Sequence, residues 1–508
     1  MEDKILFWQN REFIQFGIAE KLQSMHNCEL YAIVDDVNDY LKKFFQEQEI
    51  IDFKKIWYYT DYISIKDEKP DLKYLTKIEE DYKINLWSIA YVDRVFYSQF
   101  NKYHKFSHNE ILCLLEQECK FYENLLKEIN PDFLIIPVIT KHHAFLLYKL
   151  CKSMGIKTLT YESTHFGDKW VVTDEIDKMI DGEKYKSIKS ESKRSFQELQ
   201  NYLKKFKPDI YGTKSNPRYK ITKLNKLKAA SKFFSSGTGD YENHFSSYGK
   251  NRSSVLKKGT GTAHTLNKKE KEKFIKINLK TEITGINPFL YFPLAYEPER
   301  AILLGAPFFS NQISVISNIA KSLPVGYELF VKEHPGMEDM GWREISFYKQ
   351  ILELPNVKLF HPGVSHEDLI KKSSLTITIR GTAGLEAAFY EKPSIVFNID
   401  SGYTELPSVH LVKNSEEIPS AIRSSLGKKV LLSDVNKYVD YIEKYAVDYE
   451  QVDFTSEIAN KFGLSSGYLT KINISPKELK SFLGEYDSMF ERLSSEYLKK
   501  IKELKTTN

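Results

Sequence analysis

The feature that most constrains the fold is a regular alternation of short apolar segments and amphipathic segments between residues 288 and 412. Short apolar runs are typical of buried strands, and nearly all of the connections between them have helical periodicity. Connections of that length join parallel strands. We therefore predict a parallel sheet with helices on both faces. Its expected strands are 289–292, 327–332, 357–360, 375–379, 394–398 and 410–412.

A second alternation opens the chain and predicts another doubly wound α/β domain over residues 1–165. It has the same succession of apolar strands and helical repeats, and Gly155 ends one of its expected helices. We expect strands at 4–8, 30–34, 132–138 and 157–161, and helices over 13–22, 111–129 and 142–154.

Between the two alternations, residues 166–285 are predicted to form a basic, partly flexible insertion or linker. Residues 214–280 hold 17 Lys or Arg and only four acidic residues, whereas the whole chain has a net charge of +4. Stretches rich in Gly, Ser and Thr at 235–240 and 257–262 indicate loops. A charge run of this kind is usually a solvated surface. The alternative is a surface for an anionic partner, such as a phosphorylated lipid, an acidic glycan or the cytoplasmic leaflet of a membrane.

The chain ends in a helical segment, 426–508, after the second α/β domain at 286–425. Ser475, Pro476 and Glu478 form a helix-start pattern with a capping box. An apolar stripe at three- and four-residue steps then runs from Leu479 to Leu504. We predict a core or interface helix, and a helix on a membrane surface is the alternative.

The rest of the composition predicts a protein of the reducing cytoplasm. The four cysteines have no disulfide or metal-site spacing. Residues 1–10 lack the basic and long apolar regions of a signal peptide, and no apolar stretch approaches the length of a membrane span. We expect a cytoplasmic location, with a peripheral position on the inner face of the cell membrane as a second option because of the basic segment.

Ligands of open parallel sheets bind beyond the carboxyl ends of the strands, so the residues that follow each strand are the candidate site. The expected strand 327–332 ends in Lys332 and continues into Glu333, His334 and Pro335. A lysine and an imidazole there could bind a phosphate and balance charge on a departing nucleotide. A histidine that merely caps the strand end is equally compatible with this tetrapeptide.

A second candidate follows the expected strand 375–379, where the sequence continues R-G-T-A-G-L-E. Small residues at a strand-to-helix turn expose backbone N–H groups to an anion. The carboxylate of Glu386 could bind ribose hydroxyls. Close helix-on-sheet packing through the glycines is the alternative, and the pattern is neither a dinucleotide-binding nor a Walker motif. The candidates here are Arg380, Gly381, Thr382, Gly384 and Glu386.

The base that would activate an acceptor is expected from the first domain. The expected strand 157–161 leads into Glu162 and His165, a carboxylate and an imidazole at a carboxyl end. We predict that one of them is the base. No D-x-D cluster follows any of the expected strands.

Several motifs together resemble a known family. They are Y-F-P-L-A-Y-E-P (291–298), L-P-V-G-Y-E-L-F-V-K-E-H-P (323–335), L-P-N-V-K-L-F (354–360), S-H-E-D-L-I (365–370), T-I-R-G-T-A-G-L-E-A (378–387) and E-K-P-S-I-V-F (391–397), with Gln312 opening a helix. This combination, strongest over 290–425, resembles bacterial capsular and surface polysaccharide biosynthesis proteins of the GT-B superfamily, including Kdo-transferase-like capsule proteins. Its H-P element is similar to that of bacterial polysialyltransferases.

The resemblance implies a metal-independent glycosyltransferase whose two Rossmann-like domains face a cleft. It implies no cofactor, because the nucleotide sugar is the donor substrate. It implies a CMP-linked acidic sugar as donor and a growing, lipid-linked or polymeric glycan as acceptor. By the same analogy His334 contacts the donor phosphate, Gly381, Thr382 and Gly384 lie against phosphate or sugar, and Glu386 holds the ribose.

Three alternatives remain open at this point. A sugar-nucleotide epimerase and a transferase for CDP-linked polyols would share the fold. The segment 456–472 has the pattern of a helix-turn-helix, but its second helix offers little beyond Lys471 as a basic residue, so a DNA-binding regulator is the remote alternative and we expect no nucleic-acid partner.

Overall fold

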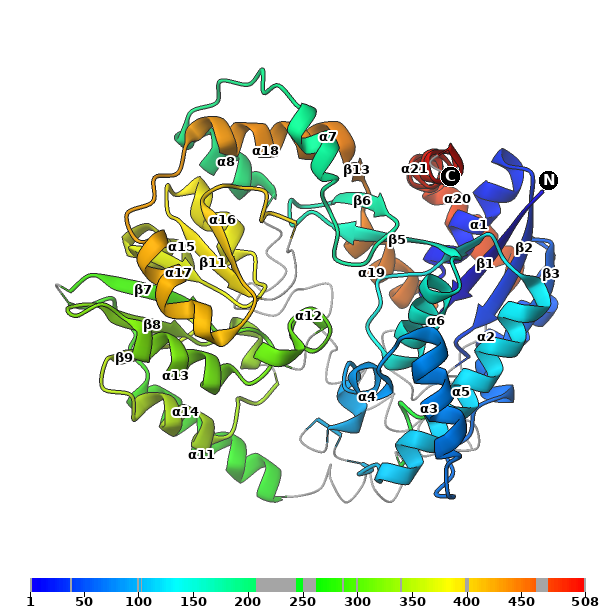
Figure 1. Ribbon diagram of the computed structural model, residues 1–508, viewed down its shortest axis with the longest axis horizontal. Helices are drawn as coiled ribbons and strands as arrows, with labels where there is room; N and C mark the ends of the chain where they lie inside the picture. The colour runs from blue at the N-terminus through cyan, green and yellow to red at the C-terminus, as the bar shows by residue number, and fades with distance from the viewer. Residues whose placement is uncertain are drawn as a thin grey trace.

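The computed structural model describes two α/β lobes, each built on its own sheet (Figure 1). One lobe contains the start of the chain and also its last helix, and the other lies between them in sequence. The structure describes residues 2–36, 39–97, 100–101, 103–206, 244–249, 262–285, 287–297, 300–338, 340–397, 402–462 and 474–506.

The sheet of the first lobe has seven strands in the order β13-β6-β5-β4-β1-β2-β3. The five strands from β5 to β3 are parallel, whereas β6 runs antiparallel to β5 and β13 antiparallel to β6. Their bounds are β1 Asp3–Gln9, β2 Cys28–Val34, β3 Phe53–Tyr58, β4 Phe133–Ile135, β5 Lys157–Ser163, β6 Lys169–Thr173 and β13 Val447–Asp448.

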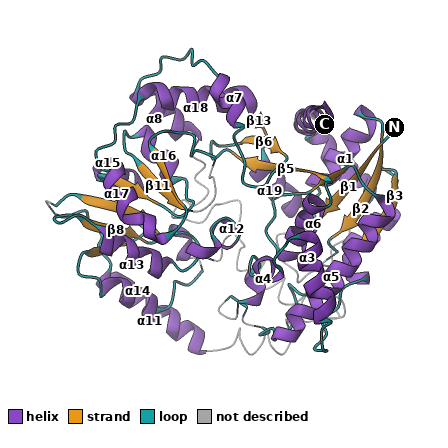
Figure 2. Ribbon diagram, viewed as in Figure 1, coloured by secondary structure: helices purple, strands orange, loops and turns teal. Residues whose placement is uncertain are grey.

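Helices cover both faces of this sheet (Figure 2). The expected strand 132–138 is shorter than predicted, since Pro137, which has no N–H for the ladder, follows soon after its end at Ile135. The helices of this part are α1 Ile14–Met25, α2 Asp39–Glu47, α3 Leu72–Tyr82, α4 Leu86–Ala90, α5 His108–Ile129 and α6 His142–Ser153, with short 3-10 turns η1 Tyr59–Asp61 and η2 Arg94–Phe96.

The sheet of the second lobe has six parallel strands in the order β12-β11-β10-β7-β8-β9. They are β7 Phe289–Pro293, β8 Glu328–Lys332, β9 Val357–Phe360, β10 Leu375–Ile377, β11 Ser394–Phe397 and β12 Val409–Val412. The helical and 3-10 segments between them are α12 Arg300–Leu303, η4 Pro307–Phe309, α13 Gln312–Ser322, η5 Pro335–Met337, α14 Ile345–Leu352, α15 His366–Lys372, α16 Ala383–Phe389, η6 Ser415–Glu417 and α17 Ile418–Ser425.

Alternate side chains of the central strands enter opposite cores, as parallel sheets covered on both faces require. In β1, Ile5 belongs to the core on one face and Leu6 to the core on the other. In β7, Leu290 and Phe289 separate in the same way. The predicted α/β fold with two parallel-sheet domains is therefore confirmed.

The chain crosses between the lobes more often than the sequence suggested. After β6 joins the first sheet, α7 (Gly182–Ser187) and α8 (Phe196–Phe206) pack on the second lobe, where Leu199 and Leu203 of α8 share a core with Phe389. α11 (Thr262–Asn278) also packs on the second lobe. The segment predicted as one insertion, 166–285, is thus divided between the two lobes, because its strand pairs with β5 and its apolar helix faces need a core.

The end of the chain returns to the first lobe. α18 (Leu432–Tyr445) packs on the second lobe, and β13 then pairs with β6. α19 (Gln451–Lys461), α20 (Pro476–Glu485) and α21 (Asp487–Thr506) follow. The apolar stripe of the tail is buried in the first core, including Phe490 and Tyr497, so the predicted core helix is confirmed, although Tyr486 divides it into two helices.

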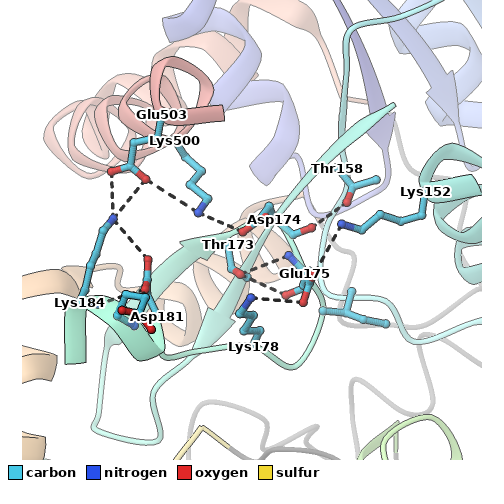
Figure 3. Close-up of polar contacts among 12 residues, drawn as sticks. Lys152, Thr158, Thr173, Asp174, Glu175, Lys178, Asp181, Lys184, Lys500 and Glu503 are labelled. Atoms are coloured by element: carbon cyan, nitrogen blue, oxygen red, sulfur yellow. Dashed lines mark hydrogen bonds and ion pairs between the residues drawn. The ribbon is translucent and has the colours of Figure 1, made fainter. Parts of the chain in front are cut away.

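Ion pairs tie α21 to the segment that links the lobes (Figure 3). Lys500 Nζ lies 3.0 Å from Asp174 Oδ1, just after β6, and Lys184 Nζ of α7 lies 3.0 Å from Glu503 Oε1. We call these two contacts the α21 ion pairs. Within the described residues, no helix combines the length and the apolar character needed to cross a bilayer.

Candidate functional site

His334 follows β8 and forms the N-cap of η5. Its Nδ1 accepts a hydrogen bond of 3.1 Å from the Gly336 backbone N–H. Burial, and then the charges of Arg343, Lys332 and His366, lower the pKa of His334 to about 4. The imidazole is therefore neutral at pH 7 and carries its proton on Nε2, which makes that nitrogen a hydrogen-bond donor.

The turn that holds His334 is fixed by its neighbour Glu333, whose side chain is fully buried. Its Oε2 accepts hydrogen bonds from Arg343 Nε at 2.9 Å and from the Tyr348 hydroxyl at 2.8 Å. Lys332, the last residue of β8, is also buried. The predicted pair of Lys332 and His334 therefore lies on a rigid support at the carboxyl end of a central strand.

Glu386 lies in the helix that follows β10 and contacts His366, whose charge acts on His334. It is buried in the first turn of α16, and its Oε1 accepts a hydrogen bond of 2.9 Å from the Thr382 hydroxyl. His366, the first residue of α15, has Nε2 at 3.4 Å from Glu386 Oε2 and Nδ1 at 2.7 Å from the Tyr291 hydroxyl. His366 was not predicted as a site residue, although it opens a helix just after β9, where the rule about strand ends could have found it.

The two predicted glycines differ in what they face. Gly381 donates its N–H to Thr378 Oγ1 at 3.0 Å, and its carbonyl accepts from Tyr403 at 2.6 Å. Gly384 is buried, and a Cβ placed there would lie 2.9 Å from the Tyr403 ring and 3.0 Å from Val396. Close packing therefore explains Gly384, which was the alternative stated for it. Its contact with a ligand stays a prediction.

A buried group of four charged side chains joins the lobes, and we call Glu162, Asp177, Arg300 and Arg380 the interlobe cluster. Arg300, in α12 of the second lobe, contacts Glu162 Oε1 at 2.9 Å and Asp177 Oδ1 at 3.1 Å. Arg380 contacts the other oxygen of Asp177 at 3.2 Å. The negative charges of the two carboxylates equal the positive charges of the two guanidinium groups. Charged side chains removed from water need such partners.

The two predicted base candidates, Glu162 and His165, lie in or beside this cluster. Burial raises the pKa of Glu162, although Arg300 opposes the shift. Burial, and then the charges of Arg380 and Arg300, lower the pKa of His165 to about 4, and Glu386 acts on the same imidazole. The structure therefore brings His165 of the first lobe close to the predicted residues of the second. Asp177 and Arg300, which organise this contact, were not predicted.

A second group of functional side chains lies in the first lobe, at the carboxyl ends of its strands. Asp35 follows β2, His143 lies in the first turn of α6, and His244 belongs to the described segment 244–249. We call these three buried residues the His–Asp cluster. His244 Nε2 lies 3.0 Å from Asp35 Oδ1, and His143 Nε2 lies 3.4 Å from Asp35 Oδ2. Burial would raise the pKa of Asp35, but Lys141 and His143 hold it well below its usual value.

His142, next to His143, forms a separate buried contact. Its Nδ1 lies 3.1 Å from Asp93 Oδ2 and its Nε2 lies 3.0 Å from Glu118 Oε1. Burial alone would lower the pKa of His142, but these two carboxylates raise it to about 9. Neither contact was predicted, because the partners are far apart along the chain and have no motif spacing.

Two predicted regions lie wholly or partly outside the described residues. Most of the basic segment 214–280 is among them, including the loops 235–240 and 257–261. Of the helix-turn-helix pattern 456–472, the first part falls in α19, where Ile458 is buried in the first core. The second part lies outside the described residues, so the DNA-binding alternative gains no support.

Residues 212–399 match the family described as capsule polysaccharide biosynthesis protein. The resemblance predicted from the motifs is confirmed. The match covers less than half of the chain and includes Lys332, His334 and the segment from Arg380 to Glu386. No curated protein matches the chain.

Several solved structures are similar to this chain at low identity. A UDP-GlcNAc 2-epimerase from Methanocaldococcus jannaschii, in complex with UDP-GlcNAc and UDP, is 13% identical, with 88% of this chain and 100% of that chain covered and a TM-score of 0.24. The β-Kdo 2,7-transferase KpsC from Thermosulfurimonas dismutans is 11% identical, with 75% and 98% covered and a TM-score of 0.30. The fold is therefore assigned from the two sheets of this chain itself.

Proposed function

We propose that the protein is a glycosyltransferase that moves a sugar from a nucleotide-sugar donor to a growing capsular or surface glycan. One observation carries the proposal. His334, with its proton on Nε2, follows β8, and the paired residues His366 and Glu386 follow β9 and β10 at the same edge of the sheet, inside the part of the chain that matches the capsule family. Ligands of parallel sheets bind at this edge.

In this proposal each group has one task. Nε2–H of His334 donates a hydrogen bond to a donor phosphoryl oxygen and stabilises the charge that grows on it as the glycosidic bond breaks. Lys332 adds positive charge beside it, and Glu386, oriented by Thr382 and His366, accepts hydrogen bonds from the ribose hydroxyls. We favour a CMP-linked acidic sugar, because its leaving group carries a single phosphate that these few groups could balance without a metal.

Glu162 is the better candidate for the base that takes the acceptor's proton. Its raised pKa moves towards neutral pH, where a general base works best, whereas His165 with a pKa of about 4 holds a proton too weakly. Arg300 would keep the Glu162 carboxylate oriented. Replacing Glu162 by Gln should lower kcat and leave donor KM nearly unchanged, and His165→Gln should lower kcat less.

The proposal is tested with His334→Ala and a matched control, His361→Ala. His361 also follows a strand and accepts a backbone hydrogen bond at Nδ1, from Gly363 at 3.0 Å, but the proposal gives it no task. We expect His334→Ala to fold and to lose about a hundredfold in kcat, as for removal of one oxyanion donor. Equal activity of both variants in a sugar-transfer assay would refute the assignment of His334.

The donor is tested by thermal shift with CMP, CDP, UDP and GDP, since a ligand that binds only the folded state raises Tm. We expect the largest rise with CMP, and a smaller rise in Glu386→Ala. A rise with CDP alone would favour transfer from a CDP-linked polyol. Conversion of a UDP-sugar to its epimer without any acceptor would favour the epimerase alternative.

A further inference from the structure

The His–Asp cluster of Asp35, His143 and His244 has the composition of a metal site. Two imidazoles and one carboxylate are a common ligand set for divalent first-row metals. In the part of the chain that the structure describes, these three residues form one of two groups whose possible ligand atoms all lie within 4.8 Å of one another. They come from three separate segments, and all three side chains are buried.

The spacing of the ligand atoms fits a tetrahedral ion. With metal–ligand bonds near 2.0–2.1 Å, neighbouring ligand atoms of such a site are about 3.3 Å apart. In this structure, His244 Nε2 lies 3.0 Å from Oδ1 of Asp35, and His143 Nε2 lies 3.4 Å from Oδ2 of the same carboxylate. Nδ1 of His244 lies 2.7 Å from the Ser246 hydroxyl and accepts a hydrogen bond of 3.2 Å from the Ser246 backbone N–H. Without a metal the His244 proton is therefore on Nε2, and it must leave when an ion binds there.

His143 provides the second and independent observation. It is 1% exposed, yet neither of its ring nitrogens makes a hydrogen bond to any described residue. Nε2 points towards Asp35 without the geometry of a hydrogen bond. Polar atoms buried in this way usually have a partner in the protein, a water or an ion. The ring is otherwise enclosed by aromatic side chains, those of Trp8, Tyr59 and Phe245.

The surrounding charge also suits a cation. Asp35, Asp93 and Glu118 supply three buried carboxylates, and His142 bridges the last two. Lys141 is near them, with its Nζ 3.9 Å from Asp35 Oδ2. Even with both Lys141 and His142 counted as cations, two positive charges face three carboxylates, which leaves room for further positive charge.

We propose that Asp35, His143 and His244 bind a divalent transition-metal ion of the Zn²⁺ type. The ion fixes the segment 244–249 to the carboxyl end of the first sheet, because His244 is the ligand from that segment. Three protein ligands leave the fourth position of a tetrahedral ion to a water molecule, and the proposal gives the ion only the task of holding this segment. The proposal is independent of the proposed glycosyl transfer and gives the ion no part in it.

The test uses Co²⁺ and Zn²⁺ with the full-length protein after treatment with a chelator. Co²⁺ reports a site through its visible absorption, and competition by Zn²⁺ gives the affinity. We expect one ion per chain and a rise in Tm on adding Zn²⁺ that EDTA reverses. Hydrogen exchange of peptides covering 244–249 should slow when Zn²⁺ is added.

His143→Phe is the decisive variant. Phe keeps an aromatic ring among the same aromatic neighbours and removes only two nitrogens that make no hydrogen bond to a described residue, so the metal-free protein should fold with an unchanged or higher Tm. Its affinity for Zn²⁺ should fall on the order of a hundredfold or more, because a ligand is lost. Asp35→Asn should weaken binding as well, whereas His26→Gln, a change in a histidine far from the cluster in sequence and paired with Asp3, should not.

Two outcomes would overturn the proposal. One is a wild-type protein that takes up no stoichiometric Co²⁺ or Zn²⁺. The other is a His143→Phe variant that binds the ion as tightly as the wild type and has the same rise in Tm. In either case His143 would be an ordinary core histidine.

Discussion

The two lobes are held together in two ways that differ in their environment. The interlobe cluster is buried, and its central Asp177 side chain is only 3% exposed. The α21 ion pairs lie at the surface, where the Glu503 side chain is 48% exposed (Figure 3). Both groups pair acids with bases at similar distances. The comparison shows that position, more than distance, decides what a charge pair contributes, because water screens exposed pairs and leaves buried ones unscreened.

The largest effect should follow from Asp177→Asn. The amide keeps the shape of the side chain but leaves Arg300 and Arg380 buried with one carboxylate fewer, which typically costs about 3–5 kcal/mol of stability. Denaturant unfolding measures the change. Asp181→Asn is the control, because asparagine caps a helix as well as aspartate does. Equal stabilities of the two variants would show that the buried group contributes no more than a surface pair.

A lower pH should reduce the stability of the folded protein, because His165 lies beside the arginines of the interlobe cluster and resists protonation. Its pKa is lowered to about 4 in the folded protein, so below pH 6.5 the unfolded chain takes up a proton that the folded one excludes. The stability due to this residue is complete above pH 6.5 and falls as the pH drops to 4, by up to about 3 kcal/mol. Unfolding measured across this range should show a shallower decline in His165→Gln. An identical slope in both proteins would contradict the shift.

Gly305→Ala should disturb the same cluster from a neighbouring loop. A Cβ at this position would lie 1.6 Å from Arg380 Nη1, so the guanidinium group must move away from Asp177. We expect a loss of about 1–3 kcal/mol, as for other overpacked sites. Gly484→Ala in α20 is the control, because a Cβ there has no described neighbour within 4 Å. Thermal unfolding should separate the two, and a harmless Gly305→Ala would mean that Arg380 tolerates displacement.

The smallest effect is expected for Glu503→Gln among the α21 ion pairs. This change removes the partner of Lys184 at an exposed position, where such pairs contribute about 0.2–1 kcal/mol. The difference from wild type should shrink further in high salt. Denaturant unfolding at low and at high salt measures the loss of stability. A loss as large as that of Asp177→Asn would show that the exposed and the buried pairs contribute equally.

The features that could be predicted from the sequence depend on residues close together along the chain. The strand 357–360 has the predicted bounds, because a short apolar run between helical repeats has few other ways to fold. His334 and Glu386 were found since their place after a strand can be read along the chain. Whether they act on a donor stays a prediction.

What the sequence missed depends on contacts between distant residues. Arg300 and Glu162 are 138 positions apart, and their pairing exists only once the lobes meet. His244 lies within the segment 166–285 that was predicted as a basic, partly flexible insertion, and its contact with Asp35 spans 209 positions. The first sheet also extends beyond the expected boundary at residue 165, because β6 pairs with β5. The sequence of β6 does not indicate which sheet the strand joins.

Because α21 packs in the core of the first lobe, its synthesis determines when folding of that core can be completed. The Phe490 ring lies so close to Gly17 that a Cβ there would be 2.4 Å from it, and the helix fills the face of the first core that α1 leaves open. A nascent chain emerging from the ribosome therefore exposes this apolar face until α21 has been translated. The core of the first lobe is completed only after the strands of the second lobe have been synthesised.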